Sequence, residues 1–123
     1  MAQNLITRTV YSSAARTASP TPSTLLNKFN TGVQVIINVT ATADTPSVVF
    51  NVQGKNGVTG EWYTLLASAA ITGTGTTVLR VAPGETDAAN AVEGAHLPRV
   101  WRVQAVHADA DSITYSVGAN LVI

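Results

Sequence analysis

Residues 99–123, RVWRVQAVHADADSITYSVGANLVI, carry the most regular pattern of the chain. Apolar side chains recur at every second position in two runs: Trp101, Val103 and Ala105, then Ile113, Tyr115, Val117 and Ala119. Such alternation with polar or small residues is typical of strands with one face on a core. The small polar linker at 107–112 has the composition of a hairpin connection. We therefore predict two β-strands joined as a hairpin.

The same period continues through residues 31–123. Val33, Val35, Ile37 and Val39 share one face, and so do Val48, Phe50 and Val52. Asn56-Gly57 predicts a hairpin turn, and residues 61–66 and 76–81 are further strand candidates, whereas residues 85–97 are interpreted as a long loop. Seven or eight short strands without a helix of packing length predict an all-β chain with a single antiparallel β-sandwich or jelly-roll-like domain.

Residues 1–30 differ from this domain. They contain the Pro/Ser/Thr-rich segment 16–24, which favours an extended conformation. Such a terminus becomes ordered only when its own domain or a neighbouring subunit holds it. We therefore predict an extended N-terminal arm over 1–30, whose removal leaves the sandwich folded. The candidate partner-binding residues on the arm are Leu5, Ile6, Val10, Tyr11, Arg16, Pro20, Pro22, Leu25 and Phe29.

The composition excludes several kinds of function. The 123 residues correspond to one domain, and the absence of cysteine rules out disulfides and thiolate metal sites. The seven Lys and Arg residues are scattered, so no nucleic-acid partner is expected, and no apolar stretch is long enough for a membrane span. A net charge of zero with only 11% charged residues favours association, which suits a subunit of an assembly.

No residue pattern predicts catalysis or a cofactor. Asp109 and Asp111 lack the further ligands of a calcium loop, and His96 and His107 have no nucleophile motif beside them. We expect no enzyme activity, no metal and no cofactor. Among the aromatic residues, Trp62 or Trp101 could form a sugar-binding platform if it were exposed, but the favoured interpretation makes Trp62, Trp101 and Tyr115 core anchors.

The stretches VVFNVQGKNGVTGEWYTLLASAAITGTGTTVLRVAPG (48–84) and LPRVWRVQAVHADADSITYSVGANLVI (97–123) resemble small β-sandwich virion proteins of tailed bacteriophages. The resemblance covers about residues 31–123, through the pattern GxWYTLL, WRV and SITYSVGA, and capsid decoration (cement) proteins are its nearest analogy. It implies a protein made in the bacterial host cytoplasm that binds the major capsid protein on the outer virion surface, as a homotrimer, and stabilises the head. The alternatives are a tail-tube or tail-tip subunit and a carbohydrate-binding β-sandwich module.

Overall fold

Residues 6–122 form nine β-strands and no helix in the structure, a computed structural model that describes this range. The predicted all-β sandwich is confirmed. The strands are β1 (Ile6–Arg16), β2 (Leu25–Leu26), β3 (Gly32–Thr42), β4 (Val48–Lys55), β5 (Trp62–Ala67), β6 (Gly75–Val81), β7 (Val92–Glu93), β8 (Val100–His107) and β9 (Ile113–Val122).

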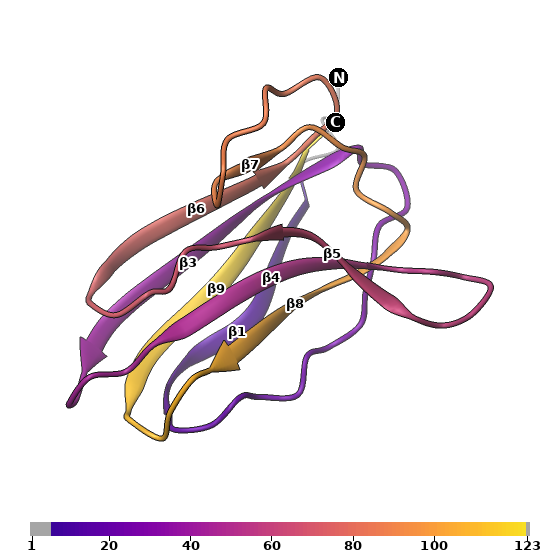
Figure 1. Ribbon diagram of the computed structural model, residues 1–123. Coiled ribbons are helices and arrows are strands. Elements are labelled where there is room, and N and C mark those ends of the chain that lie inside the picture. The colour runs from indigo at the N-terminus through magenta and orange to yellow at the C-terminus, as the bar shows by residue number, and fades with distance from the viewer. Residues whose placement is uncertain (1–5, 123) are drawn as a thin grey trace.

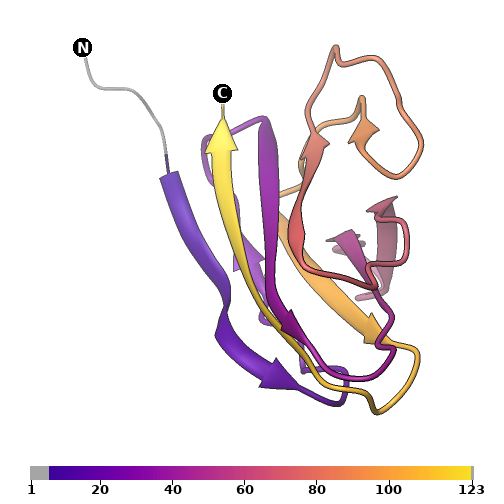
Figure 2. The ribbon, with the colours of Figure 1, turned by 90° about the vertical axis from the view of Figure 1, so that its left-hand side faces the viewer.

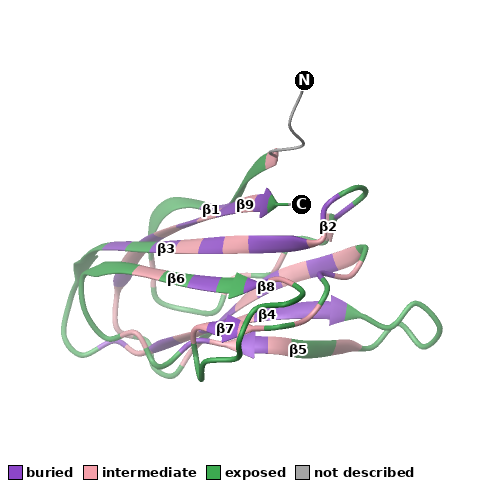
Figure 3. Cartoon of the chain, turned by 90° about the horizontal axis from the view of Figure 1, so that it is seen from above, coloured by how far each residue is buried: buried purple, intermediate pink, exposed green. Residues whose placement is uncertain are grey.

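The strands make two sheets that pack face to face (Figures 1 and 2). One sheet has the order β1-β9-β3-β6-β7 and the other has the order β2-β8-β4-β5. Figure 3 views the two layers edge-on and shows buried and half-buried residues alternating along β3. This alternation is the one expected for a strand with one face on the core.

Apart from the two-residue β7, the strands pair in a regular order from the two ends of the chain inward. The first strand pairs with the last (β1 with β9), β2 pairs with β8, β3 with β6, and β4 with β5. Within the two sheets these pairs are joined to one another, because β9 also pairs with β3 and β8 also pairs with β4. Consecutive strands therefore lie mostly in different sheets.

The predicted hairpin between the last two long strands is wrong. Strand β8 lies in one sheet and β9 in the other, so linker 108–112 crosses the sandwich instead of joining neighbours. Alternation specifies which side chains face a core but not which strand lies alongside, and both strands contribute buried faces to the same core from opposite sides. The predicted turn at Asn56-Gly57 does join a hairpin, β4 with β5.

Two of the three predicted core anchors are at the centre of the core. Trp101 and Tyr115 are fully buried, and Tyr115 packs edge-on against Phe50 with ring centroids 5.1 Å apart. Trp62 is not a core residue: it is half-buried and stands outside the buried hydrophobic cluster. Its position follows from its register, because it pairs with Lys55 on the outer face of the β2-β8-β4-β5 sheet.

The segment predicted as an N-terminal arm packs on the sandwich of its own chain. Strand β1 pairs with β9 along most of its length, and β2 pairs with β8. Tyr11 spans the two sheets: its hydroxyl donates a hydrogen bond to the carbonyl oxygen of Val103 at 2.7 Å. The segment between the two strands follows the free edge of β8, where the His107 N–H donates to Ser19 Oγ at 2.9 Å. Residues 6–30 thus belong structurally to the sandwich.

The predicted loop 85–97 contains β7, which runs parallel to β6. The loop is held by its own polar groups, since the Gly94 N–H donates to Asp87 Oδ1 at 2.7 Å. A side chain at Gly94 would collide with the carbonyl oxygen of Glu85, so glycine is required there by close approach. The loop covers the β6 edge of its sheet.

Candidate functional site

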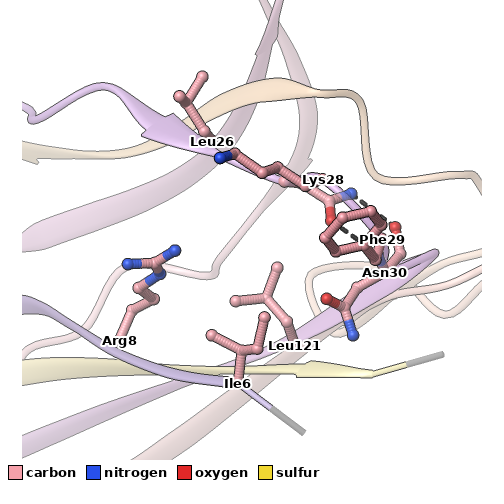
Figure 4. Close-up of a pocket in the computed structure, with 8 residues that line it drawn as sticks. Ile6, Arg8, Leu26, Lys28, Phe29, Asn30 and Leu121 are labelled. Carbon is pink, nitrogen blue, oxygen red and sulfur yellow. Dashed lines mark hydrogen bonds between the residues drawn. The ribbon is translucent and has the colours of Figure 1, made fainter. Parts of the chain in front are cut away.

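An apolar hollow lies at the end of the sandwich where β1 begins and β9 ends. Its volume is about 80 Å³, and the turn after β2 forms its opposite wall (Figure 4). A cavity of this size accommodates one side chain, whereas sites for small molecules and cofactors measure about 300–1,000 Å³. The lining residues are Ile6, Arg8, Leu26, Asn27, Lys28, Phe29, Asn30 and Leu121.

Asn27 builds the wall of this hollow. Its side-chain amide donates to the carbonyl oxygens of Asn30 at 2.6 Å and Leu97 at 3.2 Å, and its Oδ1 accepts the Asn30 N–H at 3.0 Å. Its own backbone N–H donates to the Arg99 carbonyl oxygen at 2.7 Å. These bonds close a turn of the kind that Asn side chains favour. The turn directs Phe29 outward, and 72% of that residue is exposed.

Exposed apolar residues are concentrated at this end of the molecule. Leu25 and Gly54 flank Trp101 in the sheet, so the β4–β5 hairpin leaves the sheet at the same end as the turn after β2. The hairpin projects beyond the sandwich (Figure 1). We call the apolar residues at this end of the sandwich the docking end; they are Ile6, Leu26 and Phe29 at the hollow, Val122 at the end of β9 and Val58 on the projecting hairpin.

Val58 at the tip of the hairpin is 95% exposed. The tip is nevertheless well defined, because Asn56 Oδ1 accepts the N–H of Val58 at 2.9 Å and the Asn56 carbonyl oxygen accepts the N–H of Gly60 at 2.8 Å. Gly60 has a φ of +80°, which glycine adopts without strain. A turn that is fixed by its own hydrogen bonds and exposes a valine side chain at its tip is suited to contact with another protein.

Two cations border the hollow. Arg8 comes from β1 and Lys28 from the turn (Figure 4), and neither forms an ion pair within residues 6–122. The salt bridge of that range joins Arg80 and Glu85 at 3.9 Å, at another edge of the sheet. The hollow therefore complements an apolar side chain flanked by carboxylates.

The structure places the predicted partner-binding residues in different parts of the sandwich. Ile6 and Phe29 line the hollow. Val10, Tyr11 and Leu25 pack on the core, Arg16 lies against aromatic rings, and Pro20 and Pro22 are half-buried beside β8. Leu5 lies outside the described residues. Sequence reasoning missed Arg8, Leu26, Lys28 and Val58, although a valine after Asn56-Gly57 could have been recognised as the apex of a hairpin.

Arg16, Tyr115 and His107 form a second cluster, at the other end of β1. The Arg16 guanidinium stacks 4.5 Å from the Tyr115 ring centroid and donates to the Tyr115 carbonyl oxygen at 2.9 Å. The Tyr115 hydroxyl lies 3.0 Å from His107 Nε2. Burial raises the pKa of Tyr115 to about 12, against the lowering effect of Arg16. Because Tyr115 is fully buried, the cluster joins β1, β8 and β9 rather than presenting a reactive group.

Asp109 and Asp111, the two carboxylates considered above as calcium ligands, stabilise the linker between β8 and β9 through hydrogen bonds. Asp111 Oδ2 accepts the backbone N–H of Thr45 at 3.2 Å, and Asp109 Oδ1 accepts the N–H of Asp111 at 3.1 Å. Within residues 6–122 no three His, Cys, Asp or Glu side chains come together as metal ligands. The same range contains no helix long and apolar enough to cross a membrane.

We expect His107 to make stability depend on pH. Burial lowers the pKa of His107, with a further lowering by Arg16, so the unfolded chain binds the proton more readily. The stability of the folded chain therefore falls as the pH drops through and below the unfolded value of about 6.5. Urea unfolding at about pH 7.5 and about pH 5 measures this effect: the free energy of unfolding of His107→Gln should fall less between the two pH values than that of the original chain.

The exposed-loop variant His96→Gln controls for removal of an imidazole and should keep the pH dependence of the original chain. An identical pH dependence in His107→Gln and the original chain would contradict the assignment to His107.

Comparison with known proteins gives no match to any protein-family model, any curated protein or any solved structure.

Proposed function

We propose that this chain is a structural virion protein that decorates a phage capsid, and that it binds the capsid protein lattice through the docking end. The observation that carries the proposal is the exposed Phe29, held outward by the Asn27 turn beside a side-chain-sized hollow. Exposed aromatic anchors next to small pockets are the features that supply most of the affinity of protein interfaces. The partner surface would offer an apolar side chain to the hollow and carboxylates to Arg8 and Lys28.

The winding of the strands supports this proposal. With β7 aside, β1-β9-β3-β6 faces β2-β8-β4-β5, and the pairs β1–β9, β2–β8, β3–β6 and β4–β5 are consistent with a jelly-roll winding of the sandwich. Viral capsid domains and lectins are built on jelly rolls. A fold alone does not assign a function, so the proposal rests on the docking end, and the order of the strands supports it only by analogy.

Cosedimentation with shells assembled from the capsid protein of the same virus tests the proposal. The purified chain should saturate the shells, and Phe29→Ala should weaken binding by about 30-fold, the equivalent of a central aromatic anchor worth about 2 kcal/mol. Arg8→Gln should weaken binding to the shells less than Phe29→Ala does. At higher salt the difference between Arg8→Gln and the original chain should mostly disappear, because charges at the rim of an interface are screened.

Val78→Ala is the matched control, because Val78 is an exposed apolar residue of β6 away from the docking end. It should leave binding unchanged. Full occupancy with Phe29→Ala, or no binding of the original chain, would refute the docking end as the contact.

The proposal includes a homotrimer, the state in which small decoration proteins occupy three-fold positions of a shell. Light scattering gives the native mass. A trimer supports decoration, whereas a ring of six or more copies would favour the alternative of a tail-tube subunit.

A further inference from the structure

The outer face of the β2-β8-β4-β5 sheet carries a continuous set of amide, aromatic and cationic side chains that the docking end does not use. Cross-strand partners point to the same side of a sheet, so the register places these residues together. Gln104 pairs with Asn51, Arg102 with Gln53, Gln53 with Thr64 and Lys55 with Trp62. The alternate residues of β8 and β4, among them Trp101 and Val52, face the core.

Side-chain hydrogen bonds connect the polar members of this face. Arg102 Nε donates to Gln53 Oε1 at 2.8 Å, and Gln53 Nε2 donates to Thr64 Oγ1 at 3.2 Å and to Gln104 Oε1 at 3.3 Å. Asn51 Nδ2 donates to the same Gln104 oxygen at 3.1 Å. The network holds each amide in one orientation before any ligand arrives, which lowers the entropy cost of binding.

Trp62 is half-buried on the same outer face and stacks with the cation of this network. The Arg102 guanidinium carbon is 4.1 Å from the centroid of its ring, and Lys55 Nζ is 5.6 Å away. The two terminal nitrogens of Arg102 have no hydrogen-bond partner among the described residues, and neither has Asn51 Oδ1. The face thus combines an indole with fixed donors and acceptors that remain available to a ligand.

The charge on this face has one sign. The four strands of the sheet contain no Asp or Glu, whereas Lys55 and Arg102 both stand on its outer side. A guanidinium with free terminal nitrogens is suited to bidentate binding of a carboxylate. Amides that donate and accept within one plane are suited to sugar hydroxyls, and an indole packs on the apolar side of a sugar ring.

We propose that the outer face around Trp62 and Arg102 binds a saccharide that carries a carboxylate. The ring lies against Trp62, its carboxylate pairs with Arg102 and Lys55, and its hydroxyls bond Asn51, Gln104 and Thr64. This activity goes beyond attachment to a capsid, and it leaves the docking end free. The chain would then present an acidic-sugar-binding surface while it is bound to another protein.

A glycan array that contains sialylated and uronic-acid glycans beside their neutral counterparts tests the proposal, followed by calorimetry with sialyllactose, trigalacturonate and lactose. The folded chain should bind at least one acidic saccharide at least tenfold more tightly than its neutral counterpart. Trp62→Ala and Arg102→Gln should each weaken that binding at least tenfold, and Lys55→Gln, at an exposed position, should weaken it in the same direction.

The matched controls come from the docking end: Phe29→Ala removes an exposed aromatic ring and Arg8→Gln removes an exposed cation, and both should bind the saccharide as the original chain does. The proposal is overturned if no acidic saccharide binds, if lactose binds as tightly as sialyllactose and no other acidic glycan is preferred, or if the Trp62 and Arg102 variants bind unchanged. Equal binding of polyglutamate or of a single-stranded oligonucleotide would also overturn it, because the face would then select charge and not a sugar.

Discussion

Trp101→Ala is expected to lower the free energy of unfolding by about 3–5 kcal/mol, the usual cost of removing a large buried aromatic side chain. Trp101 is fully buried on the inner face of β8, between Leu25 on one neighbouring strand and Gly54 on the other. A domain of this size has a stability of about 5–15 kcal/mol, so this loss takes about a third or more of it at the middle of that range. Urea unfolding followed by circular dichroism measures the loss.

Trp62→Ala is the matched control for this experiment, since it removes the same side chain from the outer face. We expect it to cost about 1 kcal/mol, from lost stacking with Arg102 and Lys55. Trp101→Phe should cost less than Trp101→Ala because a phenyl ring fills most of the space that the indole leaves. Both variants remove the indole N–H, which is buried without a hydrogen-bond partner among the described residues. Equal losses for the two alanine variants would contradict the assignment of Trp101 alone to the core.

A chain that begins at Thr17 is expected not to form a stable monomer. The deletion removes β1, and with it the buried side chains of Val10 and Tyr11, whose burial stabilises the fold by about 1.5–3 kcal/mol each. It also exposes the edge of β9, a long strand whose backbone groups would then be free to pair with another copy. Size-exclusion chromatography and circular dichroism should show aggregation or loss of the cooperative unfolding transition.

Tyr11→Phe separates one interaction from the rest of β1. It removes only the hydroxyl that bonds Val103 across the two sheets, and it should cost about 1–3 kcal/mol because a buried carbonyl oxygen loses its partner. If the truncated chain unfolded at the same urea concentration as the full chain, β1 would not be part of the folded domain, and the arm predicted from the sequence would be the better description.

The sequence by itself determined the class of the fold and most of the core. Period-two alternation places Val33, Ile37, Phe50, Val103 and Val117 on the inner faces, and all of them are buried. This succeeds because side-chain direction along a strand is a local property, fixed by the pleat of the backbone and independent of which strand lies alongside. The absence of cysteine and the scattered cations are equally local facts that need no structure.

Only the tertiary structure decided which strands are neighbours, and therefore where the surfaces are. Linker 108–112 looks like a hairpin turn but connects the two sheets, and residues 6–16 look like an arm but form an edge strand. The hollow joins Ile6, Phe29 and Leu121 from three distant segments, and the outer face joins Trp62 to Arg102 across an intervening strand. Such contacts depend on pairing between residues far apart in the chain, whose free energy is a sum over the whole core. No local pattern encodes that sum.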